Sequence, residues 1–232
     1  MALSPIPLEI VETIGSTSDA LKQRAEQGSE EIALLARTQT GGRGRLGRGW
    51  VSPPGNVYLS VLLRPGPLRW PGHWSLLAAV AVAETLEAVA PGAPIALKWP
   101  NDLLLSGGKL AGVLTEAGVG QTPWLVIGIG VNLEVAPEGI GRATAALGRG
   151  EAETVASRIL DRLQAWRYRY GAEGFAPVRT AWLRRGPENG VALAVRCGSE
   201  MLIGKFAGIA ESGALLLATP SGTVPVVAGE VC

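Results

Sequence analysis

The sequence predicts an α+β domain followed by a small β-barrel, and three observations support this fold class. Two long stretches with helical patterning, Ser75–Val89 and Glu153–Tyr170, occur in the first part of the chain. Short β-rich runs separate them. After an Arg-Gly-Pro segment the character changes, and residues 191–232 contain four or five short apolar runs between Gly and Ser turns. We therefore expect one domain over 1–186 and a second over 187–232.

The first elements surround a glycine-rich segment. A helix is predicted over about 17–27, because hydroxyl residues and an aspartate precede its apolar positions and Gly28 follows it. The apolar run 32–38 fits a buried strand. Residues 39–50 hold five glycines and cannot form regular structure. Val57–Leu63 is rich in β-forming residues and predicts the next strand.

A group of short strands and two helices is expected next. The helix Ser75–Val89 is apolar on all sides, which predicts a central position. Gly107-Gly108 predicts a hairpin turn. A shorter helix is predicted at about Phe175–Arg184. The predicted strands between the long helices are Ile95–Trp99, Leu103–Leu105, Leu110–Thr115 and Trp124–Val131.

Composition excludes several classes of protein. Hydrophobic residues make up 47% of the chain and charged residues 18%, which excludes a disordered protein. A formal net charge of +1 gives no general attraction to nucleic acid. Cys197 and Cys232 form no disulfide framework, and His73 is the only histidine, so histidine metal cages are excluded. With no signal peptide or membrane span in the sequence, we expect a cytoplasmic protein.

The strongest local signal is the run Gly41 to Trp50, GGRGRLGRGW. Its glycines allow backbone N–H groups to approach a ligand, and its three arginines suit phosphate or carboxylate. A solvated basic turn and an RNA contact are the competing interpretations. The run is not a Walker A loop, since no Gly-Lys-Ser/Thr follows.

Two further stretches carry candidate site residues. In Lys98-Trp99-Pro100-Asn101-Asp102 the polar side chains project from the end of a strand, and Lys109 opens the returning strand of the hairpin. The alternatives are a surface ion pair between Lys98 and Asp102, and a solvated Lys109. In Val126–Leu133 two glycines and an asparagine fit either tight packing or ligand contact.

Taken together, four stretches resemble the catalytic core of bacterial biotin–protein ligases in order and spacing, over about residues 9–135. The resemblance implies a mixed β-sheet backed by helices, of the class II synthetase and biotin ligase type, with a small C-terminal SH3-like β-barrel. The four stretches are GSTS (15–18), QTGGRGRLGRGW (39–50), KWPNDLLLSGGKLAGVLTE (98–116) and IGIGVNL (127–133).

The same resemblance implies an activity. In that family, the biotin carboxylate attacks the α-phosphorus of ATP with Mg²⁺, giving biotinyl-5′-AMP and pyrophosphate. A lysine of a biotin carboxyl carrier protein, such as an acetyl-CoA carboxylase subunit, then takes the biotin. DNA is not an expected partner, because the family core begins too early in this chain to leave room for a helix-turn-helix. A membrane is not expected either, because no apolar run is long enough to span one. Dimers are common among relatives.

Roles carry over to matching positions. Arg45, Arg48 and Lys109 are expected to stabilise the charge that develops at phosphate. Asp102 is expected either to contact Mg²⁺ or to support a residue that contacts the ligand. The expected biotin-binding residues are Ser16, Thr17, Ser18, Gln39, Gly41, Gly42, Arg43, Gly44, Arg45, Lys109 and Gly112. The expected adenylate-binding residues are Arg43, Arg45, Arg48, Trp50, Asn101 and Asn132.

Two positions depart from the family pattern, and other functions compete. Ser18 stands where asparagine is usual, and Leu46 where many relatives carry arginine.

The alternatives are a lipoate ligase of the same fold, an RNA-binding module built on the Arg/Gly run and a non-catalytic biotin binder. An octanoyl transferase is disfavoured because residues 1–196 contain no cysteine.

Overall fold

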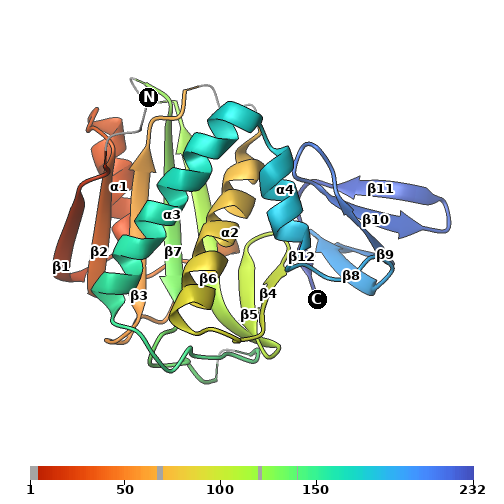
Figure 1. The fold of residues 1–232 in the computed structure, drawn as a ribbon, viewed down its shortest axis with the longest axis horizontal. Coiled ribbons are helices and arrows are strands. Elements are labelled where there is room, and N and C mark those ends of the chain that lie inside the picture. The colour runs from red at the N-terminus through yellow and green to blue at the C-terminus, as the bar shows by residue number, and fades with distance from the viewer. Residues whose placement is uncertain (1–4, 67–69, 120–121, 140) are drawn as a thin grey trace.

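The computed structural model describes residues 5–66, 70–119, 122–139 and 141–232 and contains two sheets (Figure 1). Seven strands form the first sheet, in the order β1-β2-β3-β7-β6-β5-β4. Strands β1 and β2 are parallel and the other neighbours are antiparallel, so the sheet is mixed, as predicted. These strands are β1 (Leu8–Ile14), β2 (Ile32–Gln39), β3 (Val57–Leu63), β4 (Ile95–Lys98), β5 (Asp102–Leu105), β6 (Gly108–Gly118) and β7 (Trp124–Val131).

Helices cover both faces of this sheet (Figure 1). Helix α1 (Thr17–Glu26) packs on one face through Leu21 and Ala25. Helices α2 (Pro71–Val89) and α3 (Ala152–Glu173) lie on the other face, where the large apolar core forms. The short helix α4 (Ala176–Leu183) follows them. Helix α2 is buried almost throughout, which confirms its predicted central position.

The predicted elements agree with the structure, apart from their ends and one strand. Helix α2 begins four residues before the expected Ser75, with Pro71 in the first turn, where proline costs no hydrogen bond. The hairpin between β5 and β6 turns through Ser106 and Gly107, both at positive φ, which is one residue before the predicted Gly107-Gly108, and Gly108 already belongs to β6. Strand β1 was missed. Its half-exposed residues show no clear alternation, and its parallel pairing with β2 defines it.

The second sheet contains five antiparallel strands in the order β11-β10-β9-β8-β12. It is the small β domain expected at the C-terminus and lies beside α4 (Figure 1). Its turn at 210–214 reaches the first domain, where Glu211 O lies 2.7 Å from His73 Nε2 and Trp99 Nε1 donates to Gly213 O at 3.3 Å. Its strands are β8 (Ala192–Cys197), β9 (Glu200–Ile209), β10 (Leu215–Thr219), β11 (Gly222–Val226) and β12 (Glu230–Val231).

Candidate active site

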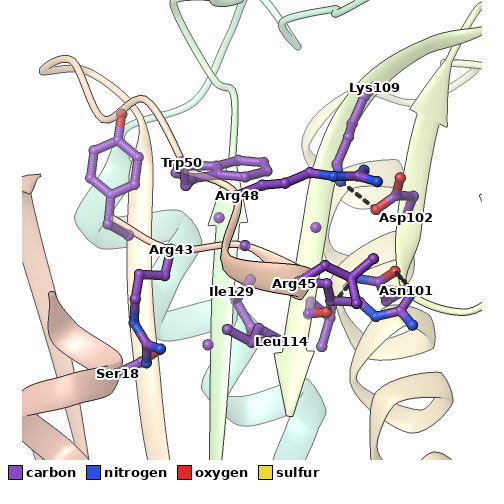
Figure 2. A pocket seen from close by; sticks show the side chains of 18 of the residues that line it. Ser18, Arg43, Arg45, Arg48, Trp50, Asn101, Asp102, Lys109, Leu114 and Ile129 are labelled. Carbon is purple, nitrogen blue, oxygen red and sulfur yellow. Dashed lines mark hydrogen bonds and ion pairs between the residues drawn. The ribbon is translucent and has the colours of Figure 1, made fainter. Parts of the chain in front are cut away.

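A pocket opens on the α1 face of the large sheet, between the glycine-rich loop and the hairpin of β5 and β6. Its floor is made of alternate residues of β3, β6 and β7, which point to one face because strand side chains alternate. Figure 2 shows the side chains above this floor. The floor positions are Tyr58, Ser60, Gly112, Leu114, Gly128 and Gly130.

Glycines on the floor admit side chains that lie flat on it. A Cβ at Gly128 would lie 2.5 Å from Ser18 Oγ, and a Cβ at Gly130 would lie 2.5 Å from Trp50 Cε2. Gly112, paired with Gly130 across the strands, leaves room for the Trp50 ring and the Lys109 ammonium. Gly128 therefore packs closely against helix α1 through Ser18, one of the two interpretations that the sequence left open, and Gly130 makes room for the Trp50 ring.

One end of the pocket is neutral and rich in hydrogen-bonding groups. Gln39 Oε1 accepts from the backbone N–H of Thr17 at 2.9 Å and lies 3.1 Å from its hydroxyl. Ser60 Oγ lies 2.8 Å from Thr17 Oγ1 and 2.9 Å from Ser18 Oγ. Ser16 caps α1 by accepting from Asp19 N at 3.3 Å, as the sequence predicted. This network can hold a small, uncharged polar ring.

The other end of the pocket is charged. Lys109 is 8% exposed and pairs with Asp102, and Arg142 Nη1 lies 3.8 Å from the second oxygen of that carboxylate. The Lys109 ammonium also lies 5.4 Å from the centre of the Trp50 ring. Burial lowers the pKa of Lys109, and the Asp102 carboxylate opposes that shift. Asp102 thus pairs with the hairpin lysine, and the interpretation of Lys109 as a solvated residue is wrong.

Two arginines of the loop complete the charged end. Arg45 Nη1 donates to Asn101 Oδ1 at 3.3 Å and to Gly229 O at 3.2 Å. Arg48 binds both oxygens of Glu230, at 2.7 and 2.5 Å. Burial lowers the pKa of Arg45, and the bidentate Arg48 guanidinium lowers the pKa of Glu230. The C-terminal sheet therefore contributes directly to this end of the site.

Arg43 points to the opposite end from Arg45. Figure 2 shows it beside Ser18, whereas Arg45 lies beside Asn101. Its guanidinium lies 2.6 Å from Asp19 and 3.1 Å from Glu116, so it is held in an ion-pair network. Arg43 therefore lies beside the hydroxyl-rich end, where Asp19 and Glu116 balance its charge, and away from Arg45 and Arg48.

Three expected ligand contacts lie outside the pocket lining. Gly41 donates its N–H to Gly15 O at 2.7 Å, and a Cβ at Gly42 would lie 2.5 Å from Trp50 O. Both glycines therefore pack against neighbouring backbone of the loop and its surroundings. Asn132 is 2% exposed, and its amide donates to the carbonyls of Lys109 and Ala145. These contacts give the three residues a structural role beside the pocket, and their direct contact with a ligand stays a prediction. The expected residues that line the pocket are Ser16, Thr17, Ser18, Gln39, Arg43, Gly44, Arg45, Arg48, Trp50, Asn101, Asp102, Lys109 and Gly112.

Sequence reasoning missed other lining residues. Ser60 is the polar position in an apolar strand, a signal that was available. Arg142 and Glu230 carry no local motif, since only the tertiary fold brings the loop after β7 and the last strand to the pocket. Lys98, which was predicted to project from the end of a strand but was given no ligand, also lines it.

Two protein-family models match this chain. Residues 10–132 match the model of the biotin/lipoate A/B protein ligase family, and residues 196–232 match that of the biotin protein ligase C-terminal domain. The first match covers more than half of the chain.

The chain belongs to the biotin/lipoate A/B protein ligase family.

Individual relatives are similar over nearly the whole chain. A biotin–[acetyl-CoA-carboxylase] ligase of Paracoccus denitrificans is 38% identical, over 96% of this chain and 98% of the relative. One from Mycobacterium tuberculosis is 37% identical, over 97% of this chain and 88% of the relative. The structure of biotin protein ligase from Aquifex aeolicus in complex with biotin and ATP superposes with a TM-score of 0.85 at 29% identity, covering 97% of each chain. This family membership confirms the resemblance and the fold class.

Proposed function

We propose that this chain is a biotin–protein ligase that activates biotin with ATP to biotinyl-5′-AMP and transfers it to a lysine of a biotin carboxyl carrier protein. One observation carries the proposal: a single pocket has a neutral hydroxyl and amide end and a cationic end. Biotin has an uncharged ureido ring and a carboxylate tail, and an adenylate adds a phosphate. The similar ligases named above act on acetyl-CoA carboxylase, which supports such a subunit as the acceptor.

The roles of the residues follow from this orientation. The ureido ring lies among Thr17, Ser18 and Gln39, and the carboxylate points to Lys109 and Arg45. The carboxylate oxygen forms a bond to the α-phosphorus as pyrophosphate leaves. Charge gathers on the phosphate oxygens at this step, and buried cations stabilise it without reorganising. In the second step the acceptor amine forms the amide bond, loses a proton, and AMP leaves.

Trp50 and Asn101 are proposed to contact the adenylate. The Trp50 ring offers a flat surface beside Lys109, which suits stacking of a base or the apolar biotin tail. Asn101 fixes Arg45 and donates to Val113 O at 2.7 Å. Asn132 is proposed to act through the Lys109 backbone that it binds.

Mg²⁺ is proposed to enter with ATP. In the part of the chain that the structure describes, no group of three His, Cys, Asp or Glu side chains is placed to hold a metal. Nucleotide-bound Mg²⁺ takes most of its ligands from phosphates and water and needs only one or two carboxylates. Asp102, at the charged end of the pocket, fits that requirement.

The further proposals concern the domain boundary, the cellular location and the partners of this chain. We place the domain boundary at 186, between the end of α4 and the start of β8. Among the described residues, no helix is long and apolar enough to cross a membrane. A cytoplasmic location, dimerisation and the lack of DNA binding stay predictions.

The test is biotin-dependent exchange between ATP and pyrophosphate by the purified chain. We expect exchange with biotin and none with lipoate, and mass spectrometry should find biotinyl-5′-AMP bound after incubation with biotin, ATP and Mg²⁺. Exchange supported by lipoate alone would assign the lipoate ligase function. No exchange with either acid would overturn the proposal.

A further inference from the structure

The C-terminal sheet has one face that the first domain does not cover. Strand pairing places Glu230, Arg196 and Met201 in one row across β12, β8 and β9. The next row on the same face pairs Ala194 with Ile203. The alternate positions of these strands, such as Val195 and Val231, belong to the buried core. We call the surface formed by Ala194, Arg196, Met201, Ile203 and Lys205 the outer face.

The outer face is apolar and basic. Ile203 is 72% exposed and Met201 45% exposed, and they are two residues apart on one strand. Arg196 and Lys205 flank them, and both are exposed. Single exposed apolar residues are ordinary, whereas here two neighbours on one face of β9 form an apolar patch between cations. Among the paired residues that the structure describes on this side of the sheet, the only carboxylate is Glu230, at the edge of the outer face.

The outer face begins at the mouth of the active-site pocket. Glu230 lines that pocket and binds Arg48 of the glycine-rich loop. The same residue pairs with Arg196, so one row of side chains leads from the pocket onto the sheet. Its neighbour Gly229 accepts from Arg45, which fixes this strand against the loop.

We propose that the outer face docks the protein whose lysine accepts biotin, a proposal that rests on the function proposed above. A lysine side chain extends only on the order of 6 Å from its Cα, from standard bond lengths. The acceptor must therefore lie on the rim while its amine reaches the pocket. The outer face adjoins that rim through Glu230, which lines the pocket and pairs with Arg196.

Charge indicates the chemistry of this partner. The described lining of the pocket contains six cationic side chains and two carboxylates, and the outer face adds Arg196 and Lys205. A surface of this sign attracts an acidic partner and accelerates its association. The partner that fits is an acidic carrier domain with apolar side chains beside its acceptor lysine.

The experiment separates the two half-reactions. Ile203→Thr keeps a β-branched residue in the strand and removes apolar area. Met201→Gln keeps the length of the side chain and makes it polar. We expect each to lower kcat/KM for an apo biotin carboxyl carrier domain of acetyl-CoA carboxylase about fivefold, the loss typical of a contributing interface residue. Lys205→Glu should lower it further at low salt, and the difference should disappear at high salt.

Two controls make the result specific to docking. Exchange between ATP and pyrophosphate, and transfer of biotin from the adenylate to hydroxylamine, should stay within about twofold of wild type in all three variants. Val119→Thr is the matched substitution, because Val119 is 80% exposed and follows β6 at the end away from Lys109. It should leave transfer to the carrier unchanged.

Two outcomes would overturn the inference while leaving the proposed function intact. One is normal transfer to the carrier by the variants at subsaturating concentrations. The other is a change in oligomeric state, measured by sedimentation, with no change in transfer, which would assign the face to a second copy of this chain. Failure of wild-type exchange would instead reject the proposed function itself.

Discussion

The two ends of the pocket differ in the chemistry of the side chains that line them. At the neutral end, Thr17, Ser18, Ser60 and Gln39 satisfy one another in a buried network. At the charged end, Lys109 and Asp102 lie buried as an ion pair, and the Arg48 pair with Glu230 is half exposed. Neutral hydrogen bonds discriminate between ligands at a modest cost in free energy. Buried charges instead stabilise the charge that develops during the reaction. The comparison predicts that the two ends control different kinetic constants.

The largest effect is expected at the charged end. Lys109→Met removes the buried ammonium and keeps the length of the side chain, so the rate of adenylation should fall about 100-fold or more. Pyrophosphate exchange measures this rate, and the apparent affinity for biotin alone, from calorimetry, should change far less. A wild-type exchange rate in this variant would remove Lys109 from the proposed chemistry.

At the neutral end we expect a smaller effect, confined to biotin. Thr17→Val and Ser60→Ala each break hydrogen bonds of the network and leave a partner unsatisfied, which costs about 1–2 kcal/mol. The KM for biotin should rise roughly five- to thirtyfold, while the KM for ATP stays unchanged. Equal changes in both constants would show that the two ends are not separate.

A pH profile tests the coupling within the charged end. The Asp102 carboxylate raises the pKa of Lys109 against the lowering effect of burial. In Asp102→Asn the ammonium should lose its proton at lower pH than in the wild type. The alkaline limb of kcat/KM for adenylation should therefore move to lower pH. A limb that stays in place would mean that Lys109 does not titrate in this reaction.

The smallest effect is expected on stability. The Arg48 and Glu230 side chains are 52% and 31% exposed, so solvent screens their attraction. Glu230→Gln should lower the free energy of unfolding by at most about 1 kcal/mol. Denaturant midpoints would measure it. A loss of several kcal/mol would indicate that this pair, rather than the buried contacts of His73 and Trp99, holds the C-terminal sheet in place.

Some features were determined by local sequence. Ser16 caps α1, the all-apolar patterning of 75–89 predicts a buried helix, and the hairpin brings Lys109 back to Asp102. Each depends on residues close along the chain, so propensity and spacing are sufficient to predict it. The combination of the Arg/Gly run with KWPND and Lys109 likewise predicted the family, which the comparisons confirm.

Other features were decided only by tertiary structure. Arg43 carries the same side chain as Arg45 and lies two residues away, yet it binds Asp19 and Glu116 on another part of the fold. Glu230 reaches Arg48 across 182 positions, and Ser60 meets Thr17 and Ser18 from a different strand. Side-chain direction in a loop and pairing between distant strands depend on long-range packing, which no local pattern encodes.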